Sequence, residues 1–268
     1  MSKLRFCALP LALVAAALSL AACGGGTTET SPTPASPTAT ATATPTPTPS
    51  AVATAAANES AAPTAGPPAE TQPPPATDPP VAGVTMLSPV DKDHALPADY
   101  VPPALAAIPG PYLAPGFGGE LRQEAVDALV RMLDDADAAG HDVRARSAYR
   151  SYAAQESTFN YWVGVLGYDA AVRVSAMAGH SEHQLGTTAD LTSPAVGWDL
   201  LESFGPTPEG QWLAANAHDY GFALSYPAGA EVITGYSYEP WHFRYIGTAQ
   251  AQAWKASGLT LNQYLLQP

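Results

Sequence analysis

The chain has 268 residues, a formal net charge of −13 and two cysteines. Residues 83–268 contain nine Lys or Arg and 20 Asp or Glu, with no basic run. This balance argues against nucleic acid as a partner and against electrostatic docking to an anionic lipid surface. Because Cys7 and Cys23 are both near the N-terminus, the rest of the chain has no disulfide and no thiolate nucleophile or metal ligand.

Residues 1–22 have the pattern of a secretion signal. Two basic residues precede an apolar run from Phe6 to Ala22, which is short for a membrane span. The run ends in Leu-Ala-Ala-Cys-Gly, which resembles a bacterial lipobox, where cleavage precedes the cysteine and the cysteine is lipidated. We therefore expect a lipoprotein signal peptide at 1–22 and a lipid on Cys23. A plain signal peptide and a short membrane anchor are the alternatives.

Residues 23–83 are expected to form a disordered linker. Positions 24–82 contain 14 of the chain's 28 prolines and no Phe, Trp, Tyr, Lys or Arg. Such a Pro/Thr/Ala-rich segment cannot bury enough apolar surface to offset the entropy lost on ordering. Residues 84–268 remain, which is enough for one domain with a hydrophobic core.

Hydrophobic periodicity and turn residues predict both helices and strands in this domain. It begins with an irregular, proline-rich segment over 86–103. Apolar side chains at three- and four-residue steps, or a capping residue before an apolar face, predict helices at 120–139, 151–166, 169–176, 207–220, 248–256 and 262–266. Alternating or β-branched runs predict strands at 143–148, 187–192, 222–226, 231–236 and 242–246.

Two stretches far apart in the sequence contain residues that suit a metal site. His183 and Asp190 are seven residues apart across a glycine, and His242 follows about fifty residues later. Two imidazoles and one carboxylate, with a fourth position open, are what a catalytic zinc ion requires. His180 could compete with His183 as a ligand, but the step to Asp190 and the intervening Gly186 favour His183.

Glu239 is predicted to be the general base. In a plain strand, residues three apart point to opposite faces of the sheet. A turn at Pro240-Trp241 would let the side chains of Glu239 and His242 converge. We therefore predict that Glu239 takes a proton from a zinc-activated water as it attacks a carbonyl, and passes that proton to the leaving amine.

Arg150 lies where the strand at 143–148 meets the helix at 151–166, a usual place for a residue that faces a cleft. It would stabilise the developing oxyanion or hold a substrate carboxylate, and a surface arginine is the alternative. Ser181 and Gln155 are expected to contact substrate through hydrogen bonds. The chain has no His-Glu-x-x-His helix and no Gly-x-Ser-x-Gly turn, which argues against those metalloprotease and serine hydrolase classes.

Three motifs occur in a specific order. They are Ser-Ala-Tyr-Arg-Ser-Tyr-x-x-Gln at 147–155, Ser-Glu-His-Gln-x-Gly-x-x-x-Asp at 181–190, and Glu-Pro-Trp-His-x-Arg-Tyr at 239–245. Together they resemble the VanY-type zinc D-alanyl-D-alanine carboxypeptidases, and the resemblance extends over about 86–266.

The resemblance implies a small α+β domain whose central, mostly antiparallel sheet is flanked by helices. It implies a Zn²⁺ ion on His183, Asp190 and His242, with Glu239 as the base. It places Arg150 at the substrate. We expect Ser147 and Tyr149 to contact the substrate together with Gln155 and Ser181.

The implied activity is hydrolysis of the C-terminal D-Ala-D-Ala bond of peptidoglycan stem peptides. An LD-carboxypeptidase that trims tetrapeptide stems uses the same scaffold, and a peptidoglycan-binding module that has lost turnover is a further alternative. The expected partners are stem peptides and, through the lipid on Cys23, the membrane. We expect a monomer in the bacterial cell envelope, outside the cytoplasm.

The lipid anchor predicts a specific labelling result. In cells given a fatty-acid probe, the wild-type protein should incorporate the label, and Cys23→Ala should abolish it because the acceptor thiol is gone. Cys7→Ala is the matched control and should keep the label, since that residue leaves with the signal peptide. Label that persists in Cys23→Ala contradicts the prediction.

Overall fold

The computed structural model describes residues 83–267. The signal peptide expected at 1–22, the lipidation of Cys23 and nearly all of the linker expected at 23–83 lie outside these residues. Within 83–267, no helix has the length and apolar character needed to cross a membrane.

A four-stranded antiparallel sheet forms the centre of the domain, with the strand order β3–β4–β6–β5. The strands are β3 (Arg144–Ser147), β4 (Thr188–Thr192), β5 (Phe222–Leu224) and β6 (His242–Tyr245). β4 and β6 are the two inner strands, and their register pairs Asp190 with His242. A second, two-stranded antiparallel sheet is made by β1 (Leu105–Ala107) and β2 (Glu120–Arg122).

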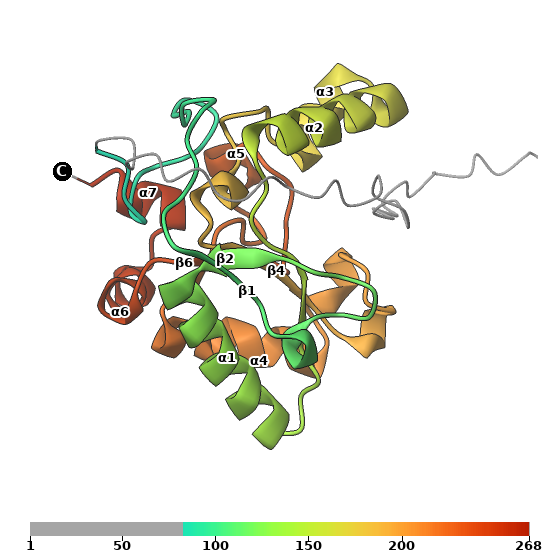
Figure 1. Cartoon of the computed structure of the whole chain (residues 1–268), viewed down its shortest axis with the longest axis vertical. Helices are drawn as coiled ribbons and strands as arrows, with labels where there is room; N and C mark the ends of the chain where they lie inside the picture. Colours follow the sequence, from blue (N-terminus) through green and yellow to red (C-terminus); the bar gives the residue numbers. More distant parts are fainter. Residues whose placement is uncertain (1–82, 268) are drawn as a thin grey trace, which may run out of the picture. The chain divides into compact units, whose positions relative to one another are not determined.

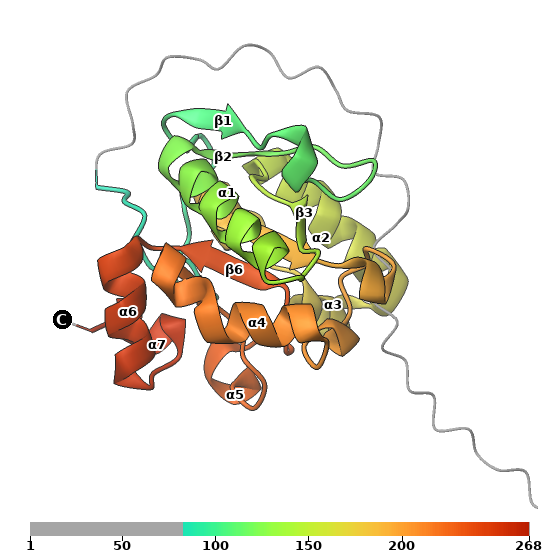
Figure 2. The ribbon, with the colours of Figure 1, turned by 90° about the horizontal axis from the view of Figure 1, so that it is seen from below.

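One face of the central sheet is covered by α1 (Gln123–Ala138) and α4 (Pro208–Asn216), as Figures 1 and 2 show. The main hydrophobic core lies between these helices and the sheet. It includes one face of α1 and inward-facing strand residues such as Ala189, Leu191 and Phe243. These three residues alternate with polar neighbours because successive side chains of a strand point to opposite faces.

The other side of the sheet is flanked by α2 (Tyr152–Leu166), α3 (Tyr168–Val174) and α5 (Glu231–Thr234) (Figure 1). α6 (Thr248–Ser257) and α7 (Leu261–Leu265) complete the chain. Short 3₁₀ turns occupy Gly110–Tyr112, Glu182–Leu185, Pro194–Val196, Glu202–Phe204 and Ala217–Tyr220.

The predicted α+β class and the mostly antiparallel sheet are confirmed. The strand predicted at 231–236 is wrong, because residues 231–234 form the single-turn helix α5. The β-branched run that suggested a strand has no neighbouring strand to pair with in the described chain, and Val232 is fully exposed. The backbone N–H groups of Ile233 and Thr234 instead donate to Ala230 O. The helix predicted to begin at 120 begins at Gln123, since residues 120–122 pair with β1.

The irregular segment 86–103 packs against the loop that leads into β4. Val90, Leu96 and Tyr100 form a small buried cluster with Leu185. The Gln184 side chain also donates hydrogen bonds to Pro97 O and Tyr100 O. The segment therefore fixes the loop that carries His183.

Gly186 ends that loop at a position that only glycine suits. Its φ is +69°, and an added Cβ would lie 2.8 Å from Pro102 Cγ. We predict that Gly186→Ala lowers the free energy of unfolding by about 2–4 kcal/mol, since backbone strain and overpacking act together. Gly140 also has a positive φ (+86°) but has open space around it, so Gly140→Ala should cost only about 1 kcal/mol from backbone strain. Urea unfolding of both variants tests this; equal losses would show that the contact with Pro102 is unimportant.

Candidate metal centre

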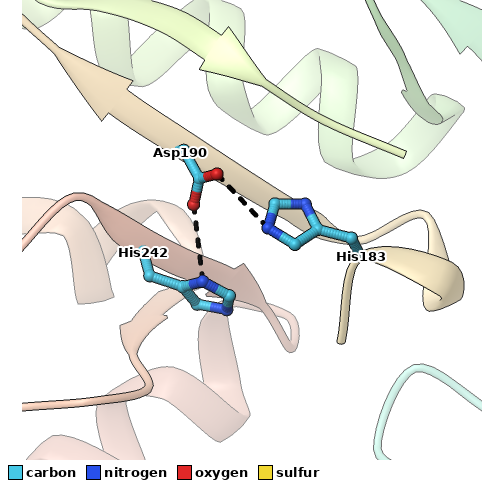
Figure 3. A group of neighbouring side chains, drawn as sticks. All are labelled: His183, Asp190 and His242. Carbon is cyan, nitrogen blue, oxygen red and sulfur yellow. Dashed lines mark ion pairs between the residues drawn. The ribbon is translucent and has the colours of Figure 1, made fainter. Parts of the chain in front are cut away.

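Three side chains from separate segments converge on the face of the sheet opposite the main core (Figure 3). His183, Asp190 and His242 are all buried, and one potential ligand atom from each lies within 4.8 Å of the others. Asp190 lies between the two rings, with Oδ2 3.3 Å from His183 Nε2 and Oδ1 3.4 Å from His242 Nδ1. Among the described residues, this is the group of His, Cys, Asp and Glu whose geometry suits a metal ion.

The sheet register explains why these residues meet. Asp190 and His242 are directly opposite on β4 and β6, where side chains of one face lie about 5 Å apart. His183 is supplied by the 3₁₀ turn Glu182–Leu185, which Gly186 ends in the left-handed conformation just before β4. A local turn and a strand pair therefore bring together residues that are about sixty positions apart.

Glu239 joins this cluster as the sequence predicted. The backbone N–H of His242 donates a hydrogen bond to the backbone oxygen of Glu239 at 3.2 Å, which closes a turn over Pro240-Trp241. That turn brings Glu239 Oε2 within 3.3 Å of His242 Nδ1. Burial raises the pKa of the Glu239 carboxyl group, and the neighbouring His242 only partly offsets this. A buried carboxylate with a raised pKa is suited to accept and return a proton.

Each histidine has one ring nitrogen held by the protein and the other directed at the cluster. His183 Nδ1 lies 2.7 Å from Ala148 O. Because a carbonyl oxygen can only accept, Nδ1 bears the proton and Nε2 keeps its lone pair. His242 Nε2 lies 3.0 Å from Glu182 Oε2. This leaves His242 Nδ1 as the nitrogen that could bind a metal ion at the centre of the cluster. Hydrogen bonds of this kind orient histidine ligands in metalloproteins.

Glu182 is part of a buried polar network that sequence reasoning missed. Its Oε1 accepts a hydrogen bond from Arg244 at 2.8 Å, and its Oε2 accepts one from Ser225 at 2.6 Å. Burial acts to raise the pKa of Glu182, but Arg244 and His242, with the Ser225 hydrogen bond, lower it to about 2. Arg244 also donates to Met86 O and Ser88 O. The signal was in the sequence, because Arg244 is two residues after His242 and must point to the same buried face.

The donor set fits a divalent cation. Asp190 Oδ1 is buried and has no hydrogen-bond donor among the described residues, a costly state that a bound cation would relieve. Burial tends to lower the pKa of His242, yet the carboxylates of Asp190, Glu182 and Glu239 raise it well above the usual value. The local field therefore favours positive charge at this point.

A cleft of about 440 Å³ opens beside the cluster, and every residue predicted to contact substrate lines it. These residues are Ser147, Tyr149, Arg150, Gln155 and Ser181. Arg150 Nη1 donates to Gln155 Oε1 at 2.9 Å, and Gln155 Nε2 donates to Ala176 O at 2.6 Å. Both ends of the Gln155 amide are thus engaged with the protein, and this side chain orients Arg150. His180 is held elsewhere, with Nδ1 2.7 Å from Asp91 O.

Comparison with known proteins agrees with this geometry. The sequence model of the VanY family, described as D-alanyl-D-alanine carboxypeptidase, matches residues 118–248. The bifunctional D-Ala-D-Ala dipeptidase and carboxypeptidase VanXYC of Enterococcus gallinarum is 30% identical over 181 residues, covering 65% of this chain and 90% of the relative. The chain belongs to the VanY D-alanyl-D-alanine carboxypeptidase family.

Other proteins similar to this VanY-family chain differ in specificity, since one is an LD-carboxypeptidase and another a D,D-pentapeptidase. The putative carboxypeptidase YodJ of Bacillus subtilis is 40% identical over 184 residues, which cover 67% of this chain and 66% of YodJ. The solved structure of the LdcB LD-carboxypeptidase is 40% identical, with a TM-score of 0.62, and the match covers 67% of this chain and 85% of LdcB. A vancomycin-resistance D,D-pentapeptidase VanY variant in complex with Zn(II) is 28% identical, with a TM-score of 0.56 and coverage of 67% and 98%.

The Glu182 network predicts a loss of metal affinity on mutation. Ser225→Ala removes one hydrogen bond to Glu182, and Glu182→Gln also removes the charge that pairs with Arg244. Because these groups orient His242, metal affinity measured by chelator competition should fall about 10–100-fold in Glu182→Gln and less in Ser225→Ala.

Glu156→Gln is the matched control, because Glu156 is exposed on α2. It should leave metal affinity unchanged. Thermal unfolding of each variant separates loss of folding from loss of affinity, and wild-type affinity in folded Glu182→Gln would rule out the orienting role.

Proposed function

We propose that this chain is a zinc-dependent carboxypeptidase that removes the terminal D-Ala from the D-Ala-D-Ala end of peptidoglycan stem peptides. The observation that carries this proposal is the convergence of His183, Asp190 and His242 beside the buried carboxylate of Glu239. The family description and the Zn(II) complex of a related VanY protein support it.

His183 Nε2, His242 Nδ1 and an Asp190 carboxylate oxygen would hold the metal. Two imidazole nitrogens and one carboxylate oxygen are a ligand set typical of catalytic zinc. Bound there, zinc would supply a Lewis acid that makes water a nucleophile near neutral pH and polarises the scissile carbonyl.

The side chains around the cluster would carry out proton transfer and substrate binding. Glu239 would accept the proton of the attacking water on Oε2 and return it to the leaving amine. Arg150 lines the cleft and interacts electrostatically with both Asp190 and Glu239. From this place its guanidinium group would bind the terminal carboxylate of the peptide or the oxygen that gains charge during attack.

A second candidate is an LD-carboxypeptidase that removes D-Ala from a tetrapeptide stem. The 40% identity to the LdcB LD-carboxypeptidase favours it. The two activities differ in the residue before the terminal D-Ala, while the proposed metal, base and arginine would serve both. A binding module that has lost turnover is disfavoured because Glu239 is in place beside the three ligands.

The proposed location rests on the sequence alone. We propose that Cys23 is lipidated and that the linker lets the domain reach stem peptides above the membrane, outside the cytoplasm. We also propose that the protein acts as a monomer.

Glu239→Gln tests the mechanism. The amide keeps the shape of the side chain but cannot accept a proton, so the variant should bind zinc normally and lose about 10²–10⁴-fold in kcat. Zinc content is measured by elemental analysis. Activity is measured as D-Ala released from purified pentapeptide and tetrapeptide, with product masses that distinguish the D,D from the L,D reaction.

Glu156→Gln is again the control and should retain activity. Dialysis of the wild-type protein against a chelator should abolish activity, and added zinc should restore it. Release of D-Ala from neither peptide by the zinc-loaded protein would reject both candidate activities. Full activity in Glu239→Gln would remove Glu239 from its proposed role.

A further inference from the structure

Arg146 lies in the cleft at an irregularity of the sheet. Ala145 pairs with Leu191 in the core, and Ser147 pairs with Asp190 on the face of the metal centre. Arg146 is therefore an extra residue between two adjacent pairs, which is a β-bulge. Bulges redirect side chains next to active sites, and here both Arg146 and Ser147 line the cleft.

The guanidinium group of Arg146 is held in place but has no ion-pair partner within residues 83–267. Its Nε donates to Trp198 O at 3.2 Å, and its central carbon lies 3.4 Å from the centre of the Phe117 ring. The ion pairs within residues 83–267 include Arg122, Arg144 and Arg244 but not Arg146. Asp199 and Asp190 act on it only over longer distances. Its two terminal nitrogens are thus held in position but make no hydrogen bond or ion pair with residues 83–267.

Arg146 and Arg150 have different surroundings in the same cleft. Arg150 donates a hydrogen bond to Gln155 and interacts electrostatically with Asp190 and Glu239. Arg146 is bonded to Trp198 O and interacts with Asp199 and Asp190. Arg146 therefore lines the cleft beside Phe117 and Trp198, and Arg150 lines it beside Gln155 of α2, so the two arginines belong to different walls. A substrate whose terminal carboxylate is at Arg150 would extend past the cluster toward the other wall.

We infer that Arg146 is a specificity-determining residue that binds a second carboxylate of the substrate, on the acyl side of the scissile bond. This inference rests on the proposed function. Guanidinium groups bind carboxylates through paired, charge-assisted hydrogen bonds. The substrate class is therefore a stem peptide with a free side-chain carboxylate on a residue that precedes the scissile bond. A carboxamide at that position would bind less well, and the ammonium group of a lysine would be repelled.

The test compares three side chains at that position. Synthetic stem peptides of tetrapeptide and pentapeptide length carry a free carboxylate, a carboxamide or a lysine. For the zinc-loaded wild-type protein, kcat/KM should be about tenfold or more higher for the carboxylate than for the carboxamide, and lowest for lysine. Arg146→Met keeps a long, unbranched side chain beside Phe117 but removes the guanidinium group, and it should reduce the ratio of carboxylate to carboxamide to about one. Arg146→Lys keeps the charge and should restore part of the preference.

Arg144→Met is the matched control. Arg144 is on the same strand but pairs with Asp137 and Asp142 outside the cleft, so this variant should keep the wild-type preference. A second readout is the binding of the same peptides to zinc-loaded Glu239→Gln, with and without Arg146→Met, measured by calorimetry. The preference for the carboxylate should appear in binding and disappear with Arg146.

The outcomes separate the two proposals. If none of the peptides is hydrolysed but the carboxylate peptide binds best, the proposed activity fails and the role of Arg146 stands. If carboxylate and carboxamide peptides bind and react equally well, the role of Arg146 is overturned and the activity stands. An equal loss on all substrates in Arg146→Met would also overturn it, because this would mean that Arg146 only supports the loop at Trp198.

Discussion

The buried ion pair between Glu182 and Arg244 connects the segments that supply the candidate metal centre. Glu182 precedes His183 and Arg244 is two residues after His242, so their 2.8 Å contact joins the two histidine-bearing segments directly. Removing two charges from water is costly, and their attraction compensates only when their other hydrogen-bonding groups are satisfied. The Ser225 hydroxyl and the backbone of the 86–103 segment supply most of these partners. The proline-rich segment thereby becomes part of the site without contributing a ligand.

The strands that carry the site also build the core. On β4, Ala189 and Leu191 face the hydrophobic core while Asp190, between them, faces the cleft. On β6, Phe243 faces the core between His242 and Arg244. Because one backbone serves both faces, close packing against α1 and α4 also fixes the ligand positions on the opposite side. The centre is therefore held in one geometry by the fold itself, as a selective metal site requires.

Local patterns in the sequence predicted more of this molecule than patterns that depend on distant residues. The strands at 187–192 and 242–246 and the meeting of Glu239 with His242 followed from periodicity and a turn. The Glu182–Arg244 pair joins residues 62 positions apart, and no local pattern links them. The alternation over 143–148 would pair Arg146 with Asp190. A bulge, which depends on the pairing with β4, instead puts Ser147 opposite Asp190 and leaves Arg146 between two pairs, so that both residues line the cleft. The strand predicted at 231–236 was wrong for a related reason, since β-branched residues form a strand only where a partner strand is available.

The domain is acidic overall, so its few Lys and Arg side chains determine where a carboxylate could bind. Residues 83–268 have nine Lys or Arg against 20 Asp or Glu, so the long-range field opposes the approach of an anionic peptide. Arg244 is fully buried and balances Glu182, whereas Arg146 and Arg150 are in the cleft. At contact distance in a partly buried cleft, salt and water screen charges much less than at the exposed surface. In the proposed function, recognition of carboxylates would therefore arise from these two guanidinium groups and from a cation at the His183, Asp190 and His242 cluster. A peptide that meets only one of them remains subject to the repulsion of the surrounding acids.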